Sequence, residues 1–152
     1  MSDSPGVHVP PPIFFTSAVA AGMLLRRYAP LPIGGGAVRV IGAWACFAAF
    51  ALLLAWSFLS FLGKRTTAIP NRSATALVID GPYRITRNPM YVAMTFLSIG
   101  VGLWRNTWWI PILLLPVLIV IDRFVIAREE AYLRRRFGSE YVAFTARVRR
   151  WI

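Results

Sequence analysis

Apolar residues run along this chain in long blocks that short polar or proline-containing stretches separate. The block at 40–62 carries no charged residue, and its length lets one helix cross a hydrocarbon core of about 30 Å. A weaker block covers 13–28, where Arg26 and Arg27 close the apolar run and extend toward lipid head groups. The pattern therefore predicts two N-terminal transmembrane helices within 13–62.

The second half of the chain predicts a transmembrane helical hairpin at 89–127. Its arms are 89–104 and 108–127, and a polar corner at 105–107 separates them. Indole side chains are enriched at membrane interfaces, although aromatic contacts inside a protein core are an alternative explanation here. Three tryptophans flank this corner: Trp104, Trp108 and Trp109.

These blocks indicate one all-α membrane domain over 1–152 with about four transmembrane helices. A long cytoplasmic loop at 63–88 connects the two halves, and a cytoplasmic C-terminal helix and tail occupy 128–152. The composition agrees with a membrane protein, because 57% of residues are hydrophobic and 15% are charged, against about 25% charged in soluble domains.

The charge balance sets the expected orientation. The chain has 17 Lys and Arg against 6 Asp and Glu, a net charge of +11. Most of the basic residues lie in 63–88 and 128–152, so the positive-inside rule places these regions and both termini in the cytoplasm. In a soluble chain this charge would suggest nucleic acid, but attraction to anionic lipid head groups accounts for it here.

The loop before the hairpin ends in an unusually polar stretch, GPYRITRNPMY at 81–91. Pro89 suits the first turn of the next helix, and Arg87 immediately before it would by itself be explained as an arginine that anchors the membrane boundary. The preceding residues, 75–80, are apolar and β-branched. We expect them to lie against the membrane face or to cover a cavity.

A second polar cluster follows the last apolar block, in a helix predicted over 124–138 and ended by Gly138. Helical spacing puts Glu129 on a charged, solvated face. It puts Glu130 on the apolar stripe, where a carboxylate costs free energy unless it is paired. Glu130 is therefore expected either to pair with Arg134 at i+4 or to face a ligand. The stripe is completed by Ile126, Leu133 and Phe137.

Together these segments predict a half-buried polar pocket at the cytoplasmic membrane surface, suited to a zwitterionic or cationic ligand. No metal is expected, because the only histidine, His8, lies in the N-terminal tail and no Cys/His cluster exists. The same lack excludes catalytic triads and histidine base chemistry. The chain also lacks a glycine-rich nucleotide fingerprint.

Three stretches of this sequence, in this order, resemble the isoprenylcysteine carboxyl methyltransferase and phospholipid methyltransferase superfamily, specifically its small bacterial members. They are LVIDGPYRITRNPMY (77–91), REEAYLRRRFGSEYVAF (128–144) and RVRRWI (147–152), and the resemblance covers 66–152. It implies an S-adenosylmethionine-dependent methyltransferase, integral to the bacterial inner membrane. It also implies a cofactor enclosed by the loop, the start of the third span and the helix after the fourth.

For the methyl transfer that the resemblance implies, the chemistry of the acceptor makes Arg87 and Glu130 the expected catalytic residues. Arg87 would orient a carboxylate acceptor, and Glu130 or Glu129 would accept a proton from an amine acceptor. Asn88 stands where the eukaryotic prenylcysteine enzymes have histidine, so a titrating imidazole is excluded at that position. The implied cofactor-binding residues are Leu77, Val78, Gly81, Tyr83, Arg87, Asn88, Pro89, Tyr91, Glu129 and Glu130.

The resulting hypothesis is methyl transfer from S-adenosylmethionine to a lipophilic acceptor, such as the carboxylate of a prenyl-cysteine-like molecule. The alternatives are N-methylation of a phospholipid amine and a non-catalytic membrane partner or scaffold. A lipid substrate and membrane lipids are the expected partners, and nucleic acid is not. Three residues of the tail are expected to close the site or to contact lipid head groups: Arg147, Arg149 and Trp151.

Overall fold

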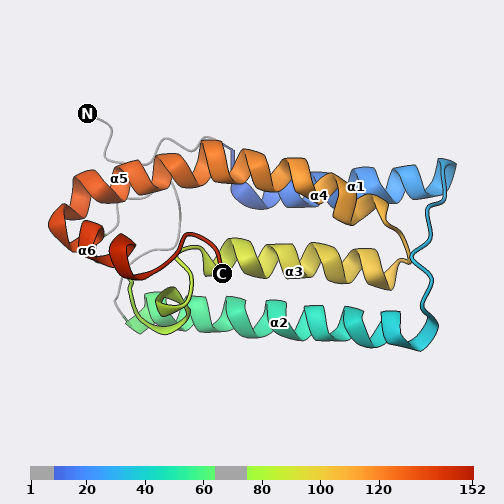
Figure 1. The fold of residues 1–152 in the computed structure, drawn as a ribbon, viewed down its shortest axis with the longest axis horizontal. Helices are drawn as coiled ribbons and strands as arrows, with labels where there is room; N and C mark the ends of the chain where they lie inside the picture. Colours follow the sequence, from blue (N-terminus) through green and yellow to red (C-terminus); the bar gives the residue numbers. More distant parts are fainter. Residues whose placement is uncertain (1–8, 64–74) are drawn as a thin grey trace.

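The computed structural model describes residues 9–63 and 75–152, which form helices and connecting loops (Figure 1). The predicted all-α class is confirmed for these residues. His8 and residues 64–74 of the predicted cytoplasmic loop lie outside the described residues. The elements are α1 (Pro11–Tyr28), α2 (Gly36–Gly63), η1 (Gly81–Arg84), α3 (Pro89–Trp104), α4 (Trp109–Val120), η2 (Ile121–Ile126), α5 (Ala127–Phe137) and α6 (Ser139–Arg147).

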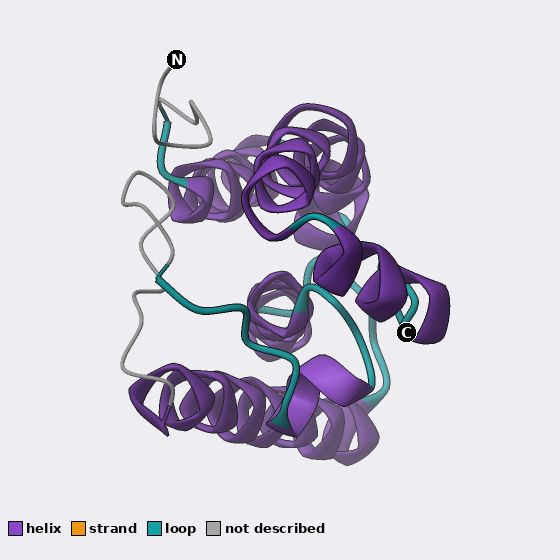
Figure 2. Ribbon diagram, turned by 90° about the vertical axis from the view of Figure 1, so that its left-hand side faces the viewer, coloured by secondary structure: helices purple, strands orange, loops and turns teal. Residues whose placement is uncertain are grey.

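The long helices lie side by side as two pairs. α2 packs against α3, and α1 packs against α4, while α3 also contacts α1 and α4. Seen end-on, α3 lies at the centre of the bundle (Figure 2). The α3–α4 pair forms the hairpin expected around residues 105–107. After α5 the chain turns back through α6, and its tail ends near the start of α3 (Figure 1).

Two helices are long and apolar enough to cross a membrane, Gly36–Gly63 and Trp109–Phe137, and α3 is a shorter apolar helix. Large apolar side chains of α2 remain exposed in the fold, including those of Val38, Leu52 and Leu59. An exposed apolar surface of this extent is typical of a membrane or partner contact. By length and composition α2 can therefore cross a membrane, and four complete spans stay a prediction.

The helix over Trp109–Phe137 is continuous but not regular. Its middle segment, η2, is a π-helix, in which i→i+5 hydrogen bonds add one residue to a turn. The predicted span at 108–127 ends inside this helix, and residues from Arg128 onward form a polar extension beyond it. Gly138 ends α5 as predicted, with φ at 53° and its N–H bonded to the Arg134 carbonyl.

Hydrogen bonds tie the loop between α1 and α2 to the corner between α3 and α4. Asn106 accepts bonds from the N–H groups of Ile33 and Gly34, both at 3.0 Å. The main chain of Trp108 donates to the Leu31 carbonyl at 2.9 Å. Arg39 caps the end of α3 by donating to its last carbonyls, those of Leu103 and Trp104. This end of the bundle is thus fixed largely through main-chain groups.

Candidate functional site

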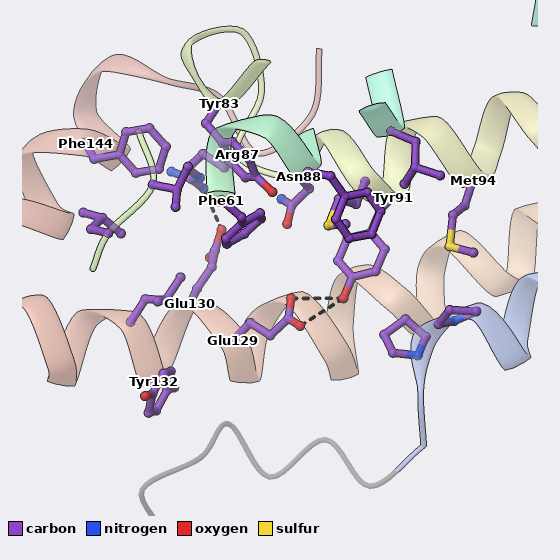
Figure 3. A pocket seen from close by; sticks show the side chains of 18 of the residues that line it. Phe61, Tyr83, Arg87, Asn88, Tyr91, Met94, Glu129, Glu130, Tyr132 and Phe144 are labelled. Atoms are coloured by element: carbon purple, nitrogen blue, oxygen red, sulfur yellow. Dashed lines mark hydrogen bonds and ion pairs between the residues drawn. The ribbon is translucent and has the colours of Figure 1, made fainter. Parts of the chain in front are cut away.

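A pocket of about 590 Å³ lies at the opposite end of the bundle from that corner, and Figure 3 shows residues that line it. Its wall combines the second half of α2, the loop before α3, the start of α3, α5 and α6. Most of the wall is apolar, and the charged groups gather in one part of it. The apolar side chains from α2 and α3 are Phe50, Leu54, Phe58, Phe61, Met90, Met94 and Leu97.

Arg87 and Glu130 form an ion pair inside this wall. The Arg87 Nη2 lies 2.8 Å from the Glu130 Oε1, and the two side chains are only 14% and 16% exposed. Arg87 also donates to the Thr145 carbonyl at 3.3 Å. Glu130 is therefore paired across the pocket rather than along its own helix with Arg134, and Arg87 is more than a boundary anchor.

Arg150, from the tail, is the second partner of Glu130. Its Nε donates to Oε1 at 3.1 Å and its Nη2 to Oε2, which makes a two-point contact. Its Nη1 lies 3.3 Å and 3.2 Å from the two carboxylate oxygens of Asp122. The hydrogen bonds with Glu130 are the main reason that the pKa of the Arg150 guanidinium is raised.

Sequence reasoning missed Arg150 and Asp122. It assigned the closure of the site to Arg147, Arg149 and Trp151, although Arg150 lies in the same RVRRWI stretch. A usable signal was Asp122, an acid within an apolar block, because ionisable residues in such segments normally have a partner. Trp151 does contribute, since its indole N–H donates to Asp122 at 2.9 Å.

Glu129 also faces the pocket, so the solvated face predicted from helical spacing is wrong. The Tyr91 hydroxyl donates to its carboxylate at 3.0 Å and 3.1 Å (Figure 3). The supposed solvated face is in fact a packed one, because Val125 and Tyr132 on it are buried. Placement of Glu129 in the pocket agrees instead with the family resemblance.

The electrostatic environment of Glu129 differs from that of Glu130. Glu129 lies in the polar extension of its helix, and burial raises the pKa of its carboxyl to about 7, with a further rise from Glu130 and an opposing effect of the Tyr91 hydrogen bond. Burial also raises the pKa of the Tyr83 hydroxyl and that of Tyr141 to about 12. Among these groups, Glu129 is the one that exchanges a proton near neutral pH.

The tail is held against the loop before α3. The Arg87 N–H donates to the Arg149 carbonyl at 2.9 Å, in an isolated bridge between Thr86 and Arg149. The Arg150 carbonyl accepts from the Thr86 hydroxyl at 3.0 Å and from the Asn88 amide at 2.9 Å. We call residues 149–151 the C-terminal strap. The Asn88 side chain thus contacts this strap as well as lining the pocket.

Eight of the ten residues predicted for the cofactor site line the pocket. Gly81 and Pro89 do not line it but shape the backbone that surrounds it. Gly81 turns the loop with φ at 62°, and Pro89 is the buried first residue of α3. Leu77 and Val78 cover the cavity, which was one of two places expected for their segment. The eight are Leu77, Val78, Tyr83, Arg87, Asn88, Tyr91, Glu129 and Glu130.

We expect Tyr91→Phe to lower the free energy of unfolding by about 1–3 kcal/mol, because the Glu129 carboxylate loses its hydroxyl donor in a buried setting. It should also raise the pKa of Glu129 further, since the Tyr91 bond lowers it. Unfolding in detergent, followed by circular dichroism, measures the first effect. Tyr28→Phe makes the same chemical change at a 76% exposed site, and equal stability of the two variants would contradict the expectation.

Metal chemistry has no ligand set in the described part of the chain. Within residues 9–63 and 75–152, no group of three or more His, Cys, Asp or Glu side chains lies close enough to hold an ion. The two acids of the pocket contact Tyr91, Arg87 and Arg150 instead.

Comparisons with known proteins place this chain in a family. A family model described as phospholipid methyltransferase matches residues 38–140. Over 65 residues the chain is 35% identical to an uncharacterized protein of Haemophilus influenzae, and this alignment covers 41% of this chain and all of that protein. Over 75 residues it is 35% identical to Protein-S-isoprenylcysteine O-methyltransferase B of Arabidopsis thaliana, which covers 47% of this chain and 36% of that enzyme.

No solved structure shows a significant match to the chain. The family match nevertheless extends over more than half of the sequence and includes the start of α3 and both acids of α5. On this ground the chain belongs to the phospholipid methyltransferase family, whose membrane methyltransferases it resembles in sequence.

Proposed function

We propose that this protein transfers a methyl group from S-adenosylmethionine to a lipophilic acceptor at the cytoplasmic face of the membrane. The observation that carries the proposal is the pocket itself, where two acids and an arginine meet at the edge of a largely apolar cavity. Family membership gives the reaction class, and the pocket gives the residues. Arg87 and Glu130 are the residues that we place at the reacting groups.

The residues present fit the proposed cofactor. Its α-ammonium and sulfonium groups are cations, which carboxylates such as Glu129 and Glu130 bind, and its carboxylate suits an arginine. The Arg87 Nε is buried and has no hydrogen-bond partner among the described residues. A buried N–H without a partner costs free energy, so an anionic group of a ligand at this point would satisfy it. Aromatic walls from Phe61 and Tyr83 suit a cation or a flat ring.

The bound cofactor supplies an electrophilic methyl group, so the protein has mainly to align the acceptor and exclude water. The apolar wall from α2 and α3 suits the hydrocarbon chain of a lipid or prenyl group. It lies beside Arg87, whose guanidinium would hold a carboxylate acceptor. A carboxylate is already ionised at neutral pH and needs no base.

A second candidate acceptor, a phospholipid amine, is supported by Glu129. An amine acceptor must lose a proton, and a carboxyl with a pKa of about 7 can take it. Glu129 is ionised above that pH and protonated below it, so amine methylation should accelerate as the pH rises through about 7. Glu129→Gln should flatten that rise.

Purified protein in detergent is expected to bind S-adenosylhomocysteine, the demethylated cofactor, with micromolar affinity in calorimetry. Arg87→Ala should weaken this binding at least tenfold, because it removes the cation of the pocket and leaves Glu130 held from one side. Arg84→Ala is the matched control, since Arg84 lies three residues earlier and is exposed. Failure of the wild-type protein to bind would refute the proposed function.

The acceptor is identified by a separate experiment. The protein is incubated with methyl-labelled S-adenosylmethionine and either total membrane lipids or small prenyl-thioether carboxylates, and the labelled product is identified by mass. A methyl ester supports the carboxylate acceptor and a methylated amine head group supports the second candidate. Cofactor binding without any labelled product would instead favour a non-catalytic membrane protein.

A further inference from the structure

Four alternating charges run from the pocket to the far side of its wall. They begin with Arg87 and continue through Glu130 and Arg150 to Asp122, each in contact with the next. Only the first two line the pocket. Arg150 and Asp122 stand behind them, so the Arg150 guanidinium acts on a ligand most directly through Glu130, the pocket residue that it contacts.

Both ends of Arg150 are fixed. Its carbonyl is held by Thr86 and Asn88, and its guanidinium divides its donors between Asp122 and Glu130. Next to it, Trp151 donates to Asp122 and packs against the core cluster that contains Tyr91, Ile121 and Val125. The position of the Arg150 guanidinium is therefore fixed, because its backbone is anchored beside Arg87.

The π segment explains how one guanidinium reaches two acids that are eight residues apart. In a regular α-helix, residues at this spacing point about 80° away from each other around the axis. One extra residue in a turn makes the spacing equivalent to seven, which reduces the angle to about 20°. η2 contains Asp122 and ends before Glu130, so it brings both acids to the face that Arg150 contacts.

The hydrogen bonds from Arg150 limit how far the Glu130 carboxylate can rotate. Arg87 donates one hydrogen bond, to Oε1, and a single bond leaves the carboxylate free to rotate about it. The two bonds from Arg150, one to each oxygen, fix its plane. Bidentate arginine contacts add this kind of geometric control, which the point charge of lysine does not.

We propose that Arg150 is a positioning residue of the pocket, which holds the Glu130 carboxylate in the orientation that binds the cofactor. The inference rests on the proposed function and extends it to the C-terminal strap, which lies beyond the family match at 38–140. The strap would then contribute to cofactor binding without lining the pocket.

The test is calorimetric binding of S-adenosylhomocysteine to the full-length protein. Arg150→Ala should raise the dissociation constant about tenfold or more, and Arg150→Lys should recover only part of the loss. Arg149→Ala is the matched control, because Arg149 belongs to the same strap, is exposed, and contributes its main-chain carbonyl to the bridge. It should bind as the wild type does.

A double-mutant cycle separates positioning from a general structural role. In a Glu130→Gln background, Arg150→Ala should add little further loss of binding, because the residue through which it acts is already changed. Independent, additive losses would overturn the proposal, and so would binding by Arg150→Ala equal to that of Arg149→Ala. Should Arg150→Ala fail to fold, Asp122→Asn and Arg150→Lys replace it, and wild-type affinity in both would overturn the proposal.

The outcomes distinguish the two proposals. If wild type and Arg149→Ala both fail to bind the probe, the proposed function fails, and the positioning role falls with it. If both bind and Arg150→Ala binds equally well, the proposed function stands and only the role of Arg150 is refuted. Tight binding by wild type with a loss confined to the Arg150 and Asp122 variants supports both.

Discussion

Glu130→Ala is expected to lower the free energy of unfolding by about 2–4 kcal/mol and to abolish binding of S-adenosylhomocysteine. The reason is that one carboxylate, 16% exposed, forms ion pairs with two arginines. Without it, Arg87 and Arg150 remain close to each other as like charges, and removal of one partner from a buried pair is strongly destabilising. The partial exposure of Arg150 reduces the effect below that of a fully buried pair.

Stability is measured by thermal or denaturant unfolding in detergent, and binding by calorimetry. Glu140→Ala is the control, because it removes an acid of the same size from α6, where the residue is exposed. Equal stability of the two alanine variants would show that the ion pairs around Glu130 contribute nothing to the fold. Retained binding in Glu130→Ala would remove Glu130 from the cofactor site.

Gly81→Ala is expected to be the other large change, with a loss of about 2–4 kcal/mol. Its backbone has φ at 62°, a left-handed conformation that costs an L-residue about 1–2 kcal/mol. An added Cβ would also meet the Ser60 hydroxyl and lie 2.9 Å from the Trp56 Nε1, and overpacking of this kind costs about 1–3 kcal/mol. The loop that supplies Leu77, Val78 and Tyr83 to the pocket should loosen with it.

Gly34→Ala isolates the conformational part of that cost. Gly34 has φ at 78° and open space where a Cβ would lie, so its variant should lose only about 1–2 kcal/mol. Ser60→Ala combined with Gly81→Ala should recover part of the difference, because it removes the nearest obstructing atom. If Gly34→Ala and Gly81→Ala unfold at the same denaturant concentration, the packing argument is wrong.

The helices were predictable because their signal is local. Apolar blocks, prolines and the corner at 105–107 set the expected bounds, and α3 begins and ends where the pattern placed it. The other long helices differ from the expected spans mainly at their ends. Pro11 starts α1 two residues before the predicted span, and Gly36 starts α2 four residues before its predicted span at 40–62.

The site was only partly predictable, because its contacts join segments far apart in the chain. Arg87 and Glu130 are 43 residues apart. Their two polar segments predicted one shared pocket, but local spacing could not give the ion pair between them. Helical spacing failed for Glu129, since it assumed a regular helix with one solvated side, whereas that side packs through Val125 and Tyr132. It could not foresee η2 either, because no residue type marks the insertion of one residue into a turn.

Different sets of contacts stabilise the two ends of the bundle. At the corner, Asn106 and Trp108 form hydrogen bonds with main-chain groups of the loop between α1 and α2, and these bonds fix the geometry of this end. At the pocket, ion pairs of Glu130 with Arg87 and Arg150 link α5 to the loop and to the tail, while neutral hydrogen bonds join the loop to the tail. Salt screens partly buried ion pairs much less than exposed ones. Ionic strength should therefore act mainly on the pairs of Arg150, whose side chain is 33% exposed, and little on the Arg87–Glu130 pair.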